Sequence, residues 1–174
     1  MSEAKVGRDF IKHELDEAIA IQRVIVDAEE KLSRSHPYAD AKRALKGSLK
    51  ADRQQLTELE TLGREHGASG TVEDVAGSMK QLMEESADKA SEAESEAYEA
   101  HAVLVSLKRK QQDSAGAMLK IARTRKDTKM RDAARDFERQ SREGARELAA
   151  ELAAFAARIA TAGSSAGGGS ARSR

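Results

Sequence analysis

Apolar residues spaced three and four apart predict that most of this chain is helical. One stripe of such positions runs over residues 3–32, and a second stripe runs over residues 39–66. Pro37 separates the two segments, because proline disfavours helical geometry in the residue before it. The glycines within residues 67–70 predict a helix cap and a loop at the end of the second helix.

The second half of the chain has a less regular pattern. Residues 72–83 predict a short helix, and a third long helix is expected to begin near residues 86–90. Its apolar stripe weakens over residues 111–116, and residues 117–126 predict a further helical turn or two. The helix boundaries over residues 111–128 therefore stay open at this point.

A fourth long helix is predicted over residues 128–160. Residues 163–174 are rich in Gly, Ser and Arg, which is typical of a flexible tail, and residues 1–162 are expected to form one domain. Four helices of this length would each span roughly 40 Å. The expected fold is all-α, an antiparallel four-helix bundle with a short extra helix in a long crossover.

Composition narrows the chemistry that this chain can perform. The chain has no cysteine, which excludes disulfides, thiolate nucleophiles and iron–sulfur clusters. It has no phosphate-binding loop, dinucleotide fingerprint or nucleophile elbow, so no enzymatic activity is predicted. No apolar run approaches the roughly 20 residues that cross a bilayer, and the first residues contain no apolar leader. A cytoplasmic protein without membrane contact is expected.

Charge is balanced overall but distributed unevenly. Residues 58–100 carry twelve acidic and three basic side chains, whereas residues 108–135 carry ten basic and three acidic ones. These opposed segments would either favour self-association or lie on neighbouring helices. The basic segment, with Arg123, Arg125 and Lys126, also suggests anion or nucleic-acid binding, but the interleaved aromatic residues typical of nucleic-acid binding are missing.

Several polar residues interrupt the apolar stripes, and each must be hydrogen-bonded or bind a ligand if it is buried. One interpretation is a polar layer across the middle of the bundle, whose side chains satisfy one another and trapped water. The other is a weak cation site. The interrupting residues are Gln22, Glu29, Asp52 and Ser141, and the members predicted for the polar layer are Gln22, Asp52, Glu96 and Gln140.

A family resemblance rests on Leu56, Leu59-Glu60, Gly67, Leu82-Met83-Glu84-Glu85 and Glu96-Ala97-Tyr98-Glu99. Over roughly residues 10–155 the chain resembles the bacterial ferritin-like family of stress-induced Yci-type proteins. The resemblance implies a ferritin-like fold and a role in stress. Intact members of that family bind two iron or manganese ions within the bundle.

Most metal ligands that the resemblance implies are replaced in this chain. The family's ligand positions fall near Ala20, Ser48, Ala51, Gln140 and Ser141, and only Glu96 keeps ligand chemistry. The first hypothesis is therefore a non-catalytic protein without a cofactor, which has a degraded di-metal site and a structural or interaction role. The second is a ferritin-like protein that retains weak iron or manganese binding through Glu96, Asp52 and Glu99. The third is the anion or nucleic-acid binder.

The four histidines do not form a metal-binding motif. His36 precedes the proline turn and His66 lies at a predicted helix end, where surface or capping roles are expected. His13 lies off the apolar stripe of its helix, and His101 is expected to point away from Glu99. A site built on imidazole ligands is therefore not predicted.

Overall fold

Five α-helices make up the computed structural model of this chain, which describes residues 3–71 and 75–165. They are α1 (Glu3–Ser35), α2 (Ala39–His66), α3 (Val75–Lys89), α4 (Glu94–Arg125) and α5 (Thr128–Ser165). The described residues contain no strand, which confirms the predicted all-α class. The break at Pro37 and the end of α2 at His66 lie where the pattern predicts them.

The predicted limits of the later helices are wrong in three places. The third long helix, α4, begins at Glu94 rather than near residues 86–90, which belong mostly to α3. It then continues through residues 111–116 without weakening, because Gln111 and Ala115 are buried and extend the stripe that faces the interior. α5 reaches Ser165, three residues into the predicted tail. The remainder of that tail, and the first residues of the predicted short helix, lie outside the described residues.

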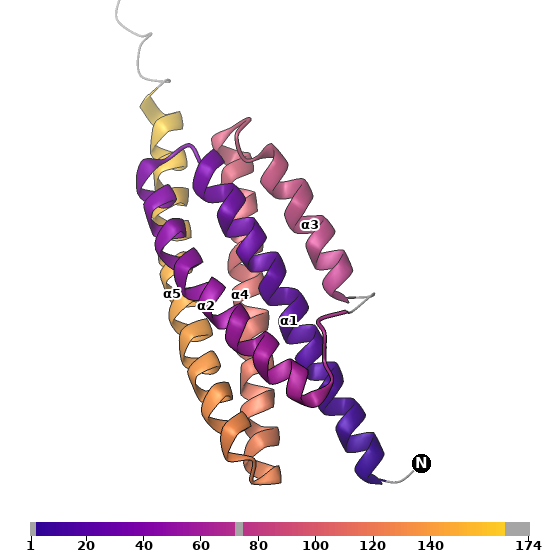
Figure 1. Cartoon of the computed structure of the whole chain (residues 1–174). Coiled ribbons are helices and arrows are strands. Elements are labelled where there is room, and N and C mark those ends of the chain that lie inside the picture. Colours follow the sequence, from indigo (N-terminus) through magenta and orange to yellow (C-terminus); the bar gives the residue numbers. More distant parts are fainter. Residues whose placement is uncertain (1–2, 72–74, 166–174) are drawn as a thin grey trace, which may run out of the picture.

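The four long helices pack as two antiparallel pairs (Figure 1). One pair is α1 with α2, and the other is α4 with α5; α1 packs against α4, and α2 packs against α5. α2 and α4 run in the same direction, so the chain between them returns along the length of the molecule (Figure 1). α3 lies in this connection and packs against α1 and α4.

A buried carboxylate on α1 holds the loop that follows α2. Asp16 Oδ1 accepts hydrogen bonds from the backbone N–H groups of Ser69 at 2.6 Å and Gly70 at 2.8 Å. Arg23 also donates to the carbonyl oxygen of Ser69 at 3.1 Å. The loop lies so close to α1 that a β carbon on Gly70 would be 2.4 Å from Cγ2 of Ile19.

Two glycines of this loop allow a matched test of the contact. Gly67 and Gly70 both have a positive φ, 74° and 75°, but a β carbon on Gly67 would meet no atom within 4 Å. Both alanine variants should therefore lose about 1–2 kcal/mol through left-handed backbone strain. Gly70→Ala should lose about 1–3 kcal/mol more, because it also overpacks the contact with α1. Urea unfolding measures the difference, and equal losses would contradict this packing.

The apolar core is divided into two clusters along the helices. The first cluster lies toward the α1–α2 turn, and the second lies toward the α4–α5 turn. Each long helix contributes apolar side chains to both clusters. The side chains buried between the two clusters are polar. The first includes Ile25, Leu32, Leu45, Leu104, Leu107 and Leu148, and the second includes Leu15, Leu59, Ala115, Met118, Met130 and Phe137.

Candidate functional site

A layer of buried polar side chains lies where the two apolar clusters meet. On α2 it falls between Leu45 and Leu59, and on α4 it falls between Leu107 and Ala115. This polar layer comprises Gln22, Glu29, Asp52, Gln55, Lys108, Gln111 and Ser141, which are all buried, and the half-buried Ser48.

Lys108 occupies the centre of the polar layer and is only 2% exposed. Its Nζ forms an ion pair with Glu29 Oε1 at 2.9 Å and a second, shorter ion pair with Asp52 Oδ2. It also donates a hydrogen bond to Ser48 Oγ at 3.0 Å. The end of the lysine lies against Gly144 of α5, where a β carbon would be 3.4 Å from Nζ. Helices α1, α2 and α4 thus meet through one ammonium group.

Two glutamines extend the polar layer between α1, α2 and α4. Gln22 Nε2 donates to Asp52 Oδ1 at 2.8 Å. Gln111 Nε2 donates to Gln22 Oε1 and to the carbonyl oxygen of Ala18, both at 2.8 Å. These bonds join side chains that are 30 and 89 residues apart in the chain, so they fix how the helices pair.

A separate hydrogen bond extends the polar layer to α5. Gln55 Nε2 donates to Ser141 Oγ at 3.1 Å, which links α2 to α5. Nearby, a groove of about 420 Å³ opens between the same two helices and is lined by Gly47, Ser48 and Leu148 among others. Ser48 is therefore shared between this groove and the polar layer.

The polar layer contains one ammonium and two carboxylates, so full ionisation would leave a buried net negative charge. Burial, opposed by the charge of Lys108 and reinforced by that of Asp52, raises the pKa of Glu29 to about 8. Burial lowers the pKa of Lys108, but the charges of Glu29 and Asp52 outweigh it and raise that pKa overall. The extra proton is therefore expected on Glu29, whose Oε2 has no hydrogen-bond partner among the described residues, whereas Asp52 accepts from three side chains.

The ligands predicted for a residual metal site are not brought together. Asp52 lies in the polar layer, but Glu96 lies half-buried in the first turn of α4, twelve residues before Lys108. Such a separation is about 18 Å along a helix. Glu99 is exposed. Both carboxylates that do meet at the centre bind an ammonium, so these residues do not fit a di-metal centre.

Of the residues predicted for the polar layer, Gln22 and Asp52 lie in it and Glu96 lies outside it. Gln140 is half-buried on α5, and its Oε1 has no hydrogen-bond partner among the described residues. Its neighbour Ser141 takes the place in the polar layer. Lys108 and Gln111 were missed, although both continue the interior stripe of α4 four residues after Leu104 and Leu107.

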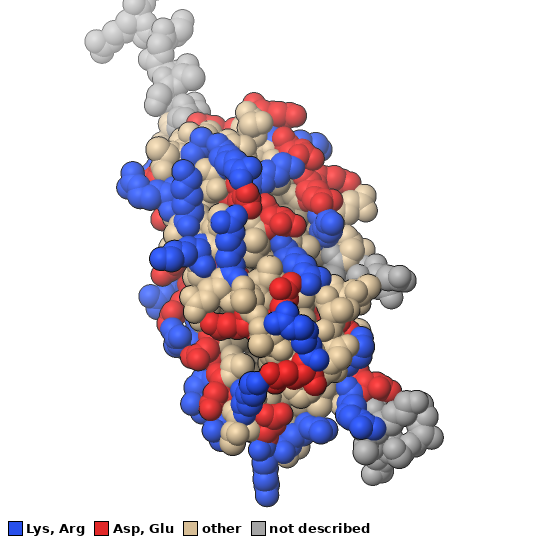
Figure 2. Space-filling view, in the orientation of Figure 1, with Lys and Arg blue, Asp and Glu red and all other residues tan. Residues whose placement is uncertain are grey.

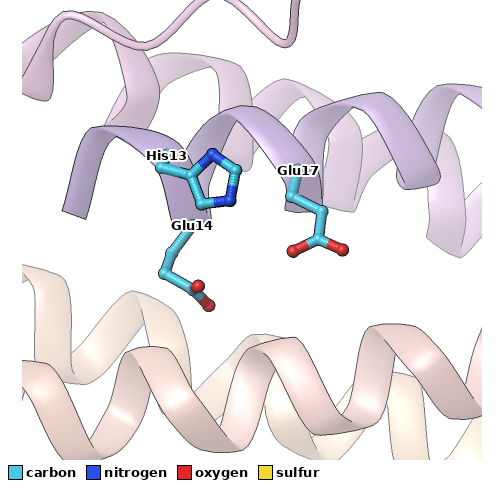
Figure 3. A group of neighbouring side chains, drawn as sticks. All are labelled: His13, Glu14 and Glu17. Carbon is cyan, nitrogen blue, oxygen red and sulfur yellow. The ribbon is translucent and has the colours of Figure 1, made fainter. Parts of the chain in front are cut away.

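A different group of potential ligands lies near the start of α1. His13, Glu14 and Glu17 place one ligand atom each within 4.8 Å of one another, and their side chains gather on one side of the helix (Figure 3). However, Glu17 Oε1 already binds Lys110 Nζ of α4 at 3.0 Å. His13 is exposed, so this group has the character of a charged, solvent-facing side of α1.

Two histidines are buried. A surface or capping role was expected for His36, whereas His101 faces the interior and points away from the exposed Glu99, as expected. His36 is 0% exposed and His101 is 1% exposed. His101 Nε2 lies 3.1 Å from the carbonyl oxygen of Leu148, so it reaches into the interface between α4 and α5. Both belong to an aromatic cluster at the α1–α2 turn rather than to the polar layer.

The comparisons with known proteins leave the family open. No protein-family model matches the sequence, and no curated protein matches it significantly. No helix in the described part of the chain has the length and apolar character to cross a membrane.

Basic and acidic side chains are interspersed over the visible face of the molecule (Figure 2). Of the predicted basic segment, Lys108 is buried and Lys129 pairs with Glu65 of the acidic segment. Arg123, Arg125 and Lys126 are exposed at the end of α4. The opposed segments therefore meet in part within the molecule, on neighbouring helices.

Proposed function

We propose that this protein is a non-catalytic ferritin-like four-helix bundle in which a lysine takes the place of the metal centre. The observation that carries this proposal is the ion pairing of Lys108 with both central carboxylates, Glu29 and Asp52. A fixed ammonium supplies positive charge where a di-metal protein would use two cations. The polar layer then serves to align the helices, and the protein acts through its surface as a structural or interaction protein.

The helix directions support the ferritin-like part of the proposal. Two antiparallel pairs joined by one long crossover are a known arrangement of four-helix bundles, and ferritin-like folds use it. Here the crossover joins α2 and α4, which run in the same direction, and contains α3 (Figure 1).

Metal analysis of the purified chain tests this proposal. Protein from cells supplied with iron and manganese should contain well under one ion per chain, because Lys108 and a proton on Glu29 together neutralise the central carboxylates. A Lys108→Ala variant provides the comparison, since it frees Glu29 and Asp52 to bind a hard cation.

Stoichiometric iron or manganese in the wild-type protein would contradict the proposal. Two further variants would then locate the ion. Loss of metal in Glu96→Ala would support the residual site expected from the sequence, whereas loss in Glu17→Gln would assign it to the group on α1.

A further inference from the structure

The turn between α1 and α2 is held in place by a cluster of aromatic and imidazole rings. The ring centroid of His36 lies 4.9 Å from that of Phe155 on α5 and 5.9 Å from that of His101 on α4. Tyr38 also packs edge-on against Phe155, with centroids 4.8 Å apart. The rings of one short turn therefore contact both helices of the opposite pair.

Hydrogen bonds assign the protons of both imidazoles. His36 Nδ1 accepts from the backbone N–H of Tyr38 at 3.2 Å, so its proton is on Nε2. His101 Nε2 donates to the carbonyl oxygen of Leu148 at 3.1 Å, so its Nδ1 carries a lone pair. His36 Nε2 and His101 Nδ1 are both buried without a hydrogen-bond partner among the described residues.

The charged groups around His36 and His101 would do little to stabilise a positive charge on either imidazole. The charge of Asp40 of α2 favours protonation of His36, but this carboxylate is bound by both terminal nitrogens of Arg158 from α5. The charge of Lys42 of α2 lowers the pKa of His36, whereas that of Asp40 raises it. From α4, Glu94 interacts with Tyr38, and from α5, Glu151 lines a small cavity beside His101.

These surroundings favour the neutral rings. Burial, together with the neighbouring His101, lowers the pKa of His36 to about 4. Burial also lowers the pKa of His101, although its hydrogen bond to Leu148 opposes the change. A proton is therefore bound more readily when the rings separate and reach water.

We propose that His36 and His101 form an acid-operated latch, in which protonation releases the α1–α2 turn from α4 and α5 while the polar layer stays closed. The latch is independent of the function proposed above. This end of the molecule opens locally at acidic pH and stays closed at neutral pH. Opening exposes the aromatic side chains around Phe155 to solvent.

Hydrogen exchange on the full chain between pH 7.5 and pH 4.5 tests the latch. After correction for the intrinsic exchange rate, the protection factors of amides in residues 33–42 should fall at least about tenfold. The reason is that the lowered pKa values of His36 and His101 favour the open state at acidic pH. Amides of residues 104–118, around the polar layer, should keep theirs. Unchanged protection of the turn, or equal loss in both segments, would overturn the proposal.

A pair of substitutions that cannot be protonated provides the matched control. His36→Asn keeps an acceptor for the N–H of Tyr38, and His101→Gln keeps a donor for the oxygen of Leu148. The double variant should keep the turn protected down to pH 4.5, and an acid response like that of the wild type would refute the latch.

Imidazole NMR signals of the wild-type protein give a second measurement that does not depend on the variants folding. The signals of His36 and His101 should titrate below the ordinary value of 6.5 and in step with the opening of the turn. Titration at 6.5 without opening would also overturn the latch.

Discussion

Lys108→Met is expected to lower the free energy of unfolding by about 3–5 kcal/mol, because it leaves the buried Asp52 carboxylate without its cation and Glu29 without its partner. Glu29 is fully buried and Asp52 is 6% exposed, so neither can recover the loss by turning to water. The Met side chain matches the length of the Lys stem, so the change removes mainly charge and hydrogen bonds. Urea unfolding at pH 7, followed by far-UV circular dichroism, measures the effect.

Lys110→Met provides the control on the same helix. The Lys110–Glu17 pair has a similar distance, 3.0 Å, but its side chains are 35% and 13% exposed. The expected loss is therefore below about 1 kcal/mol. Equal losses in Lys108→Met and Lys110→Met would contradict the central role of Lys108.

A triple variant separates the value of the ion pairs from the cost of breaking them. Glu29→Gln, Asp52→Asn and Lys108→Met together remove every charge of the centre, so much of the stability lost in Lys108→Met should return. A triple variant as unstable as the single one would indicate that the lysine acts mainly through its packing against Gly144.

The sequence predicts the helices well because their signals are local. Pro37 and Gly67 mark the two limits of α2, which runs from Ala39 to His66. Gln22 and Asp52 were also predictable, since each is a polar residue in an otherwise apolar stripe. The stripe does not identify the hydrogen-bond partner of a buried polar residue. For Gln22 this partner is Asp52, which is 30 residues away on another helix.

The centre of the polar layer was missed because its lysine belongs to a charged segment of the sequence. Lys108 lies beside Lys110 in a basic run, and such runs normally mark a solvated face. Its burial depends on Glu29 and Asp52, which are 79 and 56 residues earlier in the chain. Glu96 was misplaced for a local reason: α4 begins at Glu94, so Glu96 lies at its end rather than at mid-height.

Two buried groups give the folded protein opposite responses to pH. His36 has a lowered pKa in the folded state, so its contribution to stability is present above 6.5 and is lost as pH falls toward about 4. Glu29 has a raised pKa, so its contribution is present below about 4.5 and is lost as pH rises toward about 8. The greatest stability is therefore expected between these limits, on the acidic side of neutrality.

Glu29→Gln is expected to remove the loss of stability at alkaline pH. In the wild type, a shift from 4.5 to about 8 corresponds to a decline of at most about 5 kcal/mol as pH rises through this range. Glutamine resembles the protonated acid, so the variant should exceed the stability of the wild type by about 2 kcal/mol at pH 6 and by up to about 5 kcal/mol at pH 9. Urea midpoints at pH 6, 7.5 and 9 give the comparison.

Glu17→Gln removes a carboxylate from the same helix that pairs with Lys110 outside the polar layer, so it reports the effect of losing one negative charge and a partly exposed ion pair. If Glu29 carries the extra proton of the polar layer, only Glu29→Gln flattens the alkaline decline. An unchanged decline in that variant would mean that Glu29 is ionised beside Lys108 at neutral pH. With Asp52 also ionised, the polar layer would then hold a net negative charge, which a further cation could neutralise.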